Sequence, residues 1–250
     1  MKKAIAILGA VSEEIAGIKK SMNIADRIRL GKSEAWPGKW LEKEIVLVRT
    51  GVGKQRAADA TRKVIEKFHP QKIISLGYAG ALINELKVGD LFVAKTILSS
   101  ESDETTFEMD DPEEMKWLEK ANQIPLPKNF KLRVGKLITV DKVIHTPEGK
   151  RELGNRFGAE AVEMETLKIA LLSRENNIPF ISVRGISDEV GHELIDSSSF
   201  LGSDGEISKL KAGWYVLTHP GSLKNALSLR SHTLVATQNL TDFIAKLLTN

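Results

Sequence analysis

Three short acidic motifs in this sequence could carry out catalysis. Glu14 comes soon after one apolar run, the tripeptide Glu-Met-Glu at residues 163–165 follows a second, and Asp188 ends a third. A carboxyl group can donate or accept a proton, and a carboxylate can accept both hydrogen bonds of a vicinal diol. The motifs are therefore candidates for a site that takes a hydroxylated substrate.

The first and third motifs also have purely structural interpretations. Ser12 could be the N-cap of a helix whose first turn contains Glu13 and Glu14, where the helix dipole favours acidic side chains. Ser187 or Asp188 could cap a helix in the same way. The sequence leaves these interpretations open beside the catalytic one.

Two glycine turns follow other apolar runs, at residues 50–54 (Thr-Gly-Val-Gly-Lys) and 77–80 (Gly-Tyr-Ala-Gly). Neither has the spacing of a Walker loop or of a Rossmann turn, so the sequence contains neither nucleotide-binding motif. A small residue such as Gly80 lets a backbone approach a ligand closely, although a plain turn accounts for it equally well.

The composition excludes several classes of protein. The 250 residues include no cysteine, which excludes thiolate metal sites and cysteine nucleophiles and favours a cytoplasmic location. The five histidines lack zinc-site spacing and no Gly-x-Ser-x-Gly motif is present, so we expect no metal, no cofactor and no serine hydrolase. The net charge of +3 is small and scattered, so a nucleic-acid partner is not expected. No apolar run reaches the roughly 20 residues of a membrane-spanning helix.

The apolar runs predict the elements that must position these motifs. Runs of strand length alternate with stretches of helical period, which is typical of an α/β fold with a mostly buried sheet. The predicted strands are residues 4–8, 45–48, 73–76, 91–93, 131–140, 159–162 and 180–186. One helix is expected to end before Pro70, and another covers 166–176. We find no domain boundary, so a single domain is expected over residues 1–250.

The C-terminal part is predicted to form an amphipathic helix at about 221–249, after a loop and helix-start signal at 218–222. Its apolar stripe consists of Leu223, Leu227, Leu234, Leu240, Ile244, Leu247 and Leu248. Basic residues lie between them, including Lys224, Arg230 and Lys246. Docking onto the sheet is the favoured interpretation, and peripheral membrane contact or a partner helix is the alternative.

Taken together and in order, the motifs resemble the methylthioadenosine/S-adenosylhomocysteine nucleosidase branch of the purine nucleoside phosphorylase superfamily. Each motif is weak alone, and the resemblance comes from their common order over residues 1 to about 200. It implies one α/β domain with a central mixed sheet flanked by helices. It also implies a homodimer or larger homo-oligomer that releases adenine from a 5′-substituted adenosine.

The resemblance also implies roles for individual residues. Asp188 would protonate the purine at N7, and Ser187 would orient it. Glu14 would activate the attacking water, and Met164 and Glu165 would hold the ribose. Val143 and Ile144 match the loop that contacts the base. An acid role for Asp188 requires that it carry or share a proton, which burial or a neighbouring carboxylate would favour.

The sequence departs from that branch at three places, which leaves the 5′-substituent open. Tyr78 replaces a small serine, Thr166 and Leu167 replace a pair of small residues, and the acidic excursion at residues 101–129 differs from the usual wall of the pocket. The tail from about residue 205 looks more like hopanoid-associated phosphorylase-like relatives, for which an adenosylated lipid is the expected substrate.

Two other functions compete with hydrolysis. A phosphorylase would use phosphate as co-substrate, with Arg49, Arg56 and Arg184 as possible anion partners. The N-terminal loop of the related phosphorylases supplies an arginine where this chain has Ser12, Glu13 and Glu14. Two like charges about 4 Å apart repel by roughly 4 kcal/mol at an effective dielectric near 20, so a carboxylate at Glu14 argues for water. A non-catalytic nucleoside-binding protein is the other alternative, but binding alone would not require Glu14, Glu165 and Asp188 together.

Overall fold

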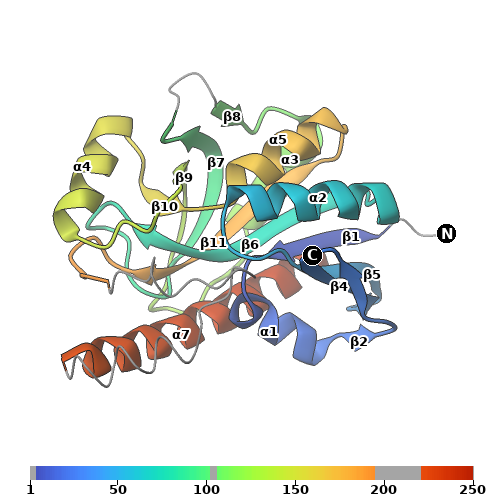
Figure 1. The fold of residues 1–250 in the computed structure, drawn as a ribbon, viewed down its shortest axis with the longest axis horizontal. Helices are drawn as coiled ribbons and strands as arrows, with labels where there is room; N and C mark the ends of the chain where they lie inside the picture. Colours follow the sequence, from blue (N-terminus) through green and yellow to red (C-terminus); the bar gives the residue numbers. More distant parts are fainter. Residues whose placement is uncertain (1–3, 102–105, 195–220, 250) are drawn as a thin grey trace.

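The predicted strands assemble into one mixed sheet (Figure 1). The computed structural model describes residues 4–101, 106–194 and 221–249, with side chains of the last segment from residue 232 onward. Within these residues the strands are β1 (Ile5–Gly9), β2 (Asn23–Ile24), β3 (Ile28–Leu30), β4 (Ser33–Trp40), β5 (Lys43–Arg49), β6 (Lys72–Ala81), β7 (Leu91–Ser99), β8 (Thr106–Glu108), β9 (Leu132–Thr139), β10 (Ala161–Glu163) and β11 (Phe180–Asp188). Their order is β10-β9-β7-β11-β6-β1-β5-β4-β2, with β3 beside β4 and β8 beside β7.

The helices cover both faces of the sheet. They are α1 (Ser12–Ser21), α2 (Lys54–Phe68), α3 (Pro112–Asn122), α4 (Pro147–Phe157), α5 (Thr166–Glu175) and α7 (Gly221–Thr249). Helices α2 and α5 pack together on one side, and α1 and α7 pack together on the other (Figure 1). The predicted α/β fold with a central mixed sheet and flanking helices is therefore confirmed.

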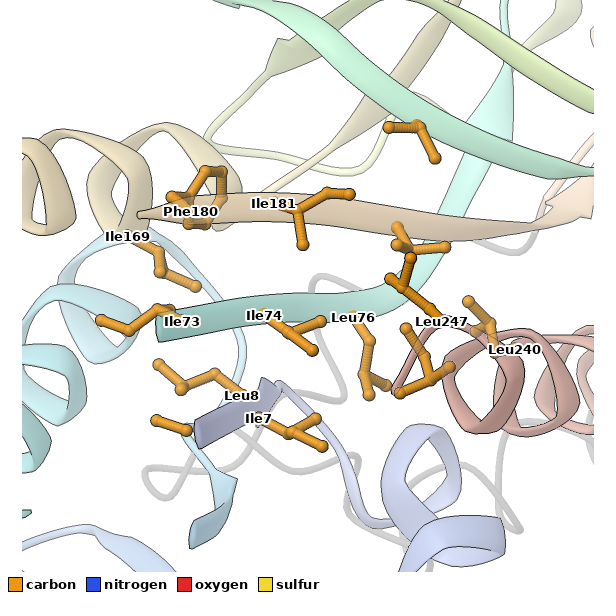
Figure 2. Close-up of a cluster of buried hydrophobic side chains, with 14 of the residues drawn as sticks. Ile7, Leu8, Ile73, Ile74, Leu76, Ile169, Phe180, Ile181, Leu240 and Leu247 are labelled. Carbon is orange, nitrogen blue, oxygen red and sulfur yellow. The ribbon is translucent and has the colours of Figure 1, made fainter. Parts of the chain in front are cut away.

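The core lies on the parallel strands at the centre of the sheet. Strands β11, β6, β1 and β5 run parallel, and every residue of β1 and β11 is buried. Figure 2 shows the apolar side chains of β1, β6 and β11 packed together, with Ile169 of α5 and Leu240 and Leu247 of α7 joining them. Burial on both faces explains why these strands are continuous apolar runs in the sequence.

Helix α7 docks onto the sheet, as the favoured interpretation predicted. Its buried side chains include Leu240, Phe243, Ile244 and Leu247. Leu234 is 64% exposed, so its assignment to the buried stripe was wrong. The side chains of Leu223, Leu227, Lys224 and Arg230 lie outside what the structure describes, as do the expected loop at 218–220 and the tail at 205–220. No helix in the described ranges is long and apolar enough to cross a membrane.

The parallel strands β1 and β11 bring Glu14 and Asp188 toward one edge of the sheet, whereas β10, which carries the 163–165 motif, runs antiparallel to β6. The carboxyl ends of parallel strands meet at the same edge, where open α/β sheets bind ligands. Strand β1 ends beside β5 with Gly9 opposite Arg49, and β11 ends with Asp188 opposite Gly80 of β6. The register shifts by one residue between Ile186 and Asp188, and such a bulge re-aims the side chains at a strand end.

Candidate active site

Glu14 is a buried carboxylate held in the first turn of α1. Its Oε2 accepts hydrogen bonds from the backbone N–H of Ala10 (2.6 Å) and Val11 (3.1 Å), and its Oε1 accepts one from Tyr78 N–H (2.9 Å). Burial raises the pKa of Glu14, although these three N–H groups and the charge of Arg184 act in the opposite direction. A carboxylate with a raised pKa at a strand end is a candidate general base.

The proposed cap of α1 was wrong. Val11 occupies the N-cap position and Ser12 is the first helical residue. The carboxylate of Glu14 instead reaches back to the N–H groups of Ala10 and Val11, which are free at a helix start. Glu13 and Glu14 do lie in the first turn of α1, as the structural interpretation predicted. It is Glu14 that binds the free N–H groups of the helix start, and these hydrogen bonds also fix the direction of its carboxylate.

Glu165 faces the glycine turn that follows β5. Its Oε1 accepts a hydrogen bond from the N–H of Gly53 at 2.6 Å, and the φ angle of +99° at Gly53 is one that favours glycine. Burial, followed by the nearby charges of Glu163 and Glu14, raises the pKa of Glu165 to about 8. The carboxyl group is therefore available to exchange its backbone partner for hydroxyl groups of a ligand.

Glu163 and Arg184 hold the turn that carries Glu165. The Oε2 of Glu163 accepts hydrogen bonds from the N–H groups of Glu165 (2.9 Å) and Thr166 (2.8 Å), and from Arg184 Nη2 (3.2 Å). Arg184 Nη2 also donates to Ser75 Oγ at 2.7 Å. The two charged side chains are buried, so this network fixes the end of β10 against β6 and β11.

A very small cavity of about 10 Å³, the size of a single water molecule, is lined by Glu14, Glu165 and Arg184. It lies between the ends of β1 and β5, the middle of β6 and β11, and the first turns of α1 and α5. Its other lining residues are Leu8, Gly9, Ala10, Thr50, Ser75, Leu76, Gly77 and Ile169. Two carboxyl groups and a guanidinium thus face one enclosed space, where a water or a sugar hydroxyl would find several hydrogen-bonding partners.

Asp188 lies beside this cavity and not in its lining. Its Oδ1 accepts a hydrogen bond from Ser187 Oγ at 2.7 Å, and its Oδ2 accepts one from the ammonium of Lys150. A Cβ atom at Gly80 would lie 2.9 Å from Oδ2, so glycine is required for Asp188 to take this place. The helix-capping interpretation of Ser187 and Asp188 was wrong, because both still belong to β11 and Ser187 donates to Asp188.

Lys150 is the residue that the sequence did not reveal. It lies one turn into α4, whose N-cap is Thr146, and it is fully buried. The signal for this helix was Thr146 followed by Pro147, an N-cap and a proline at the first helical position. Two glycines in α4 obscured its periodicity, so the contact with Asp188 could not be foreseen.

The residues expected to contact base and ribose border a second apolar cluster. Ile144 and Met164 pack against Leu82, Ile138 and Val162. Val143 is half-buried in the loop after β9. These side chains lie on elements that adjoin the end of β10.

Lys54 joins the ends of two other strands. Its Nζ lies 2.7 Å from a carboxylate oxygen of Glu101, after β7, and 2.7 Å from one of Asp141, after β9. Glu101 and Lys54 both lower the pKa of Asp141. Lys54 directly follows Gly53, so the ion-pair cluster and Glu165 both contact the turn before α2.

Tyr78 does not fill the cavity. Its hydroxyl forms a hydrogen bond with Thr237 on α7, and its backbone N–H serves Glu14. Burial raises the pKa of this hydroxyl. Tyr78, which stands where the resemblance implies a small serine, therefore contacts the C-terminal helix α7.

Comparison with solved structures defines the class of fold. The 5′-methylthioadenosine/S-adenosylhomocysteine nucleosidase of Neisseria meningitidis, in complex with methylthio-immucillin-A, aligns over 98% of each chain with a TM-score of 0.76 and 23% identity. Futalosine hydrolase of Helicobacter pylori strain 26695 aligns over 98% of this chain and 97% of its own, with a TM-score of 0.75 and 24% identity. The fold is therefore the α/β fold of these hydrolases.

The sequence comparisons identify the family. The model of the Phosphorylase superfamily matches residues 4–208. The 5′-methylthioadenosine/S-adenosylhomocysteine nucleosidase of Staphylococcus haemolyticus is 31% identical over 210 residues, which cover 79% of this chain and 92% of the relative. That of Staphylococcus epidermidis is 31% identical over 198 residues, or 74% and 86% of the two chains. The chain belongs to the phosphorylase superfamily, as its motifs predicted.

Proposed function

We propose that this chain is a purine nucleoside N-ribosyl hydrolase that releases adenine from a 5′-substituted adenosine of the methylthioadenosine or S-adenosylhomocysteine type. The observation that carries the proposal is the placement of two buried acids against one strand, with Glu14 at Gly77 and Asp188 at Gly80 of β6. The curated relatives that match most of this chain have this nucleosidase activity in their names.

The two acids have opposite tasks in this reaction. A water oxygen bonds to C1′ of the ribose while the bond between C1′ and N9 breaks. The water gives a proton to Glu14, whose raised pKa favours accepting it. Asp188 is paired with the ammonium of Lys150 in the free chain, so it takes up a proton from solvent before the reaction and then gives it to N7 of the departing base. The products are adenine and the free 5′-substituted ribose, so atoms and charges balance. A positioned acid and base each contribute typically 10² to 10⁴-fold.

The other site residues hold the substrate in this proposal. Glu165 exchanges its hydrogen bond from Gly53 for the ribose hydroxyls, and Met164 covers the sugar. Ser187 fixes the carboxyl group of Asp188, and Val143 and Ile144 contact the base. Arg184 keeps Glu163 and the turn of Glu165 in place and lines the cavity. The reaction written here uses water and side chains and requires no cofactor.

The structure favours water over phosphate as the nucleophile. Glu14 and Glu165 both line the cavity, and a phosphate there would meet two acidic groups. Arg49, one of the possible anion partners, forms an ion pair with Glu34 at 3.0 Å. Arg184 already donates to Glu163 and Ser75.

Adenine release with and without phosphate tests the proposal. We expect the purified chain to release adenine from methylthioadenosine at the same rate in both conditions, with free methylthioribose as the second product. A sugar 1-phosphate would establish the phosphorylase instead. No release from any 5′-substituted adenosine, with binding retained, would establish a nucleoside-binding protein.

We also propose a cytoplasmic homodimer or larger homo-oligomer. The absence of cysteine from the sequence supports the cytoplasmic location. The apolar side chains of α7 are buried against the sheet, which argues against a role for this helix in membrane contact. Peripheral membrane contact is the less favoured alternative. Sedimentation velocity on the full chain tests the oligomeric state.

A further inference from the structure

Lys150 is a fully buried lysine that takes no part in the proton transfers proposed above. Its ammonium donates to Asp188 Oδ2, to the carbonyl oxygen of Glu189 at 3.0 Å and to that of His192 at 3.0 Å. An ammonium group has three N–H donors, so each donor has one acceptor. The lysine is therefore fully satisfied and its direction is fixed.

A buried ion pair of this kind needs a reason beyond stability. Removing two charges from water costs several kcal/mol per ion, and apolar pairs of similar volume are often as stable. Asp188 is itself 4% exposed, so both charges are out of water. The pair also connects two separate elements, α4 and the end of β11.

The contacts of Lys150 define the position of the carboxyl group of Asp188 from one side. Ser187 donates to Oδ1 of Asp188 and Lys150 donates to Oδ2. Oδ2 lies so close to the backbone of Gly80 that a Cβ atom there would clash with it. The same ammonium holds the loop that follows Asp188, which is closed by a hydrogen bond from His192 N–H to Glu189 carbonyl oxygen at 3.0 Å. One cation thus orients the acid and anchors the chain after it.

We infer that Lys150 is a positioning residue for the reaction, which acts through Asp188 by holding its carboxyl group and the loop 189–192 in the orientation that reaches the base. The inference rests on the proposed function. Misplacement of a catalytic group by about 1 Å can cost 10²-fold in rate, so loss of Lys150 affects turnover more than binding.

The test compares Lys150→Met, Lys150→Gln and Lys150→Arg in the full chain, with methylthioadenosine as substrate. We expect Lys150→Met to lower kcat about 10- to 100-fold with KM little changed, and Lys150→Arg to retain more activity than either neutral variant. Each variant is also combined with Asp188→Asn. If Lys150 acts through Asp188, the Lys150 substitutions should not lower kcat further in the Asp188→Asn background.

Glu114→Gln is the matched control, because Glu114 is a buried carboxyl group on α3 that accepts a hydrogen bond from Phe180 N–H away from the site. The amide oxygen of Gln can still accept this hydrogen bond, so the variant should fold and leave kcat unchanged. If Lys150→Met does not fold, the Gln and Arg variants test the inference in the same way, each alone and combined with Asp188→Asn. Unchanged kcat in the neutral variants, or equal losses in the wild-type and Asp188→Asn backgrounds, would overturn the inference. If the wild-type chain itself releases no adenine, the proposed function fails first.

Discussion

Gly77 and Gly80 lie on the same strand, and each makes room for a different acid. A Cβ atom at Gly77 would lie 2.6 Å from Glu14 Oε1, and one at Gly80 would lie 2.9 Å from Asp188 Oδ2. Three residues of a strand span about 10 Å, a length on the scale of a nucleoside. Strand β6 therefore sets how far apart, along its own length, the proposed base and the proposed acid contact it.

Replacement of Gly80 tests this spacing. In Gly80→Ala, the new Cβ would also lie 3.3 Å from Val162 Cγ1, so Asp188 must move or β10 must shift. We expect kcat to fall at least tenfold, since the acid loses its position. Glu66→Ala, on the exposed face of α2 and away from the site, is the control. Equal activity of the two variants would contradict the role of Gly80.

Much of the fold could be predicted because the central strands are buried on both faces. Runs such as residues 73–76 and 180–186 predict buried strands, and an acidic motif follows the second of them. Strand β4 was not predicted, because it contains Pro37 and Gly38, which are unusual within a strand. Its place near the edge of the sheet tolerates both.

The site was predictable only in part, for a related reason. Glu14, Glu165 and Asp188 stand at the ends of predicted strands, where position alone suggests a site. Lys150 lies on a mainly polar helix 38 residues away from Asp188 in the sequence. No periodicity indicates which lysine of such a helix will be buried, because that depends on how α4 packs against the end of β11.

Asp188→Asn should abolish turnover and leave the fold and base binding nearly intact. The amide has the same shape but cannot deliver a proton to N7. We expect a loss of 10² to 10⁴-fold in kcat, the usual contribution of a general acid. Adenine binding, measured by calorimetry, serves as the control for an intact site. A variant with more than about a tenth of the wild-type activity would remove Asp188 from the acid role.

Glu14→Gln should slow adenine release strongly if water is the nucleophile. The amide cannot accept the proton of water, and it places an NH₂ group near backbone N–H donors that now bond to the carboxylate. We expect a fall of at least 10²-fold in kcat, with or without phosphate. Glu13→Gln, one residue away and on the surface, should leave kcat unchanged. Phosphate-stimulated turnover in the wild type would count against hydrolysis.

The raised pKa of Glu165 predicts a pH dependence of stability. A carboxyl group with a pKa near 4.5 in the unfolded chain and about 8 in the folded one binds more protons when folded between these values. The contribution of Glu165 to the free energy of unfolding is therefore largest below pH 4.5. It decreases as the pH rises toward 8, by at most about 1.4 kcal/mol per pH unit. We expect the melting temperature of Glu165→Gln to fall less between pH 5 and pH 8 than that of the wild type.

Glu114 also contributes to the pH dependence of stability, and the comparison of Glu165→Gln with the wild type cancels its contribution. Burial raises its pKa to about 7, so it contributes a slope of the same sign to both proteins. The difference between wild type and Glu165→Gln isolates Glu165. Identical pH dependence of the two melting temperatures would show that Glu165 is ionised in the folded chain.

The 5′-substituent is expected to be small or polar, not lipidic. The cluster of Lys54, Glu101 and Asp141 lies next to the glycine that binds Glu165, so charged groups adjoin the proposed ribose site. An alkyl chain that passed them would remove them from water, which is costly for ion pairs. On α7, Lys246 donates to the carbonyl oxygen of Pro125 at 2.9 Å and is not directed at a membrane surface.

The measurement is kcat/KM across adenosine derivatives with 5′-alkylthio groups of increasing length, together with co-sedimentation on anionic liposomes at low and high salt. We expect kcat/KM to fall as the alkyl chain lengthens, and no salt-sensitive binding to the liposomes. Lys54→Met should make kcat/KM fall more steeply with chain length, because Glu101 and Asp141 lose their cation and become more costly to remove from water. Lys63→Met, on the exposed face of α2, should leave this dependence unchanged. Long-chain substrates that react as well as methylthioadenosine, with liposome binding lost at high salt, would favour an adenosylated lipid as the substrate instead.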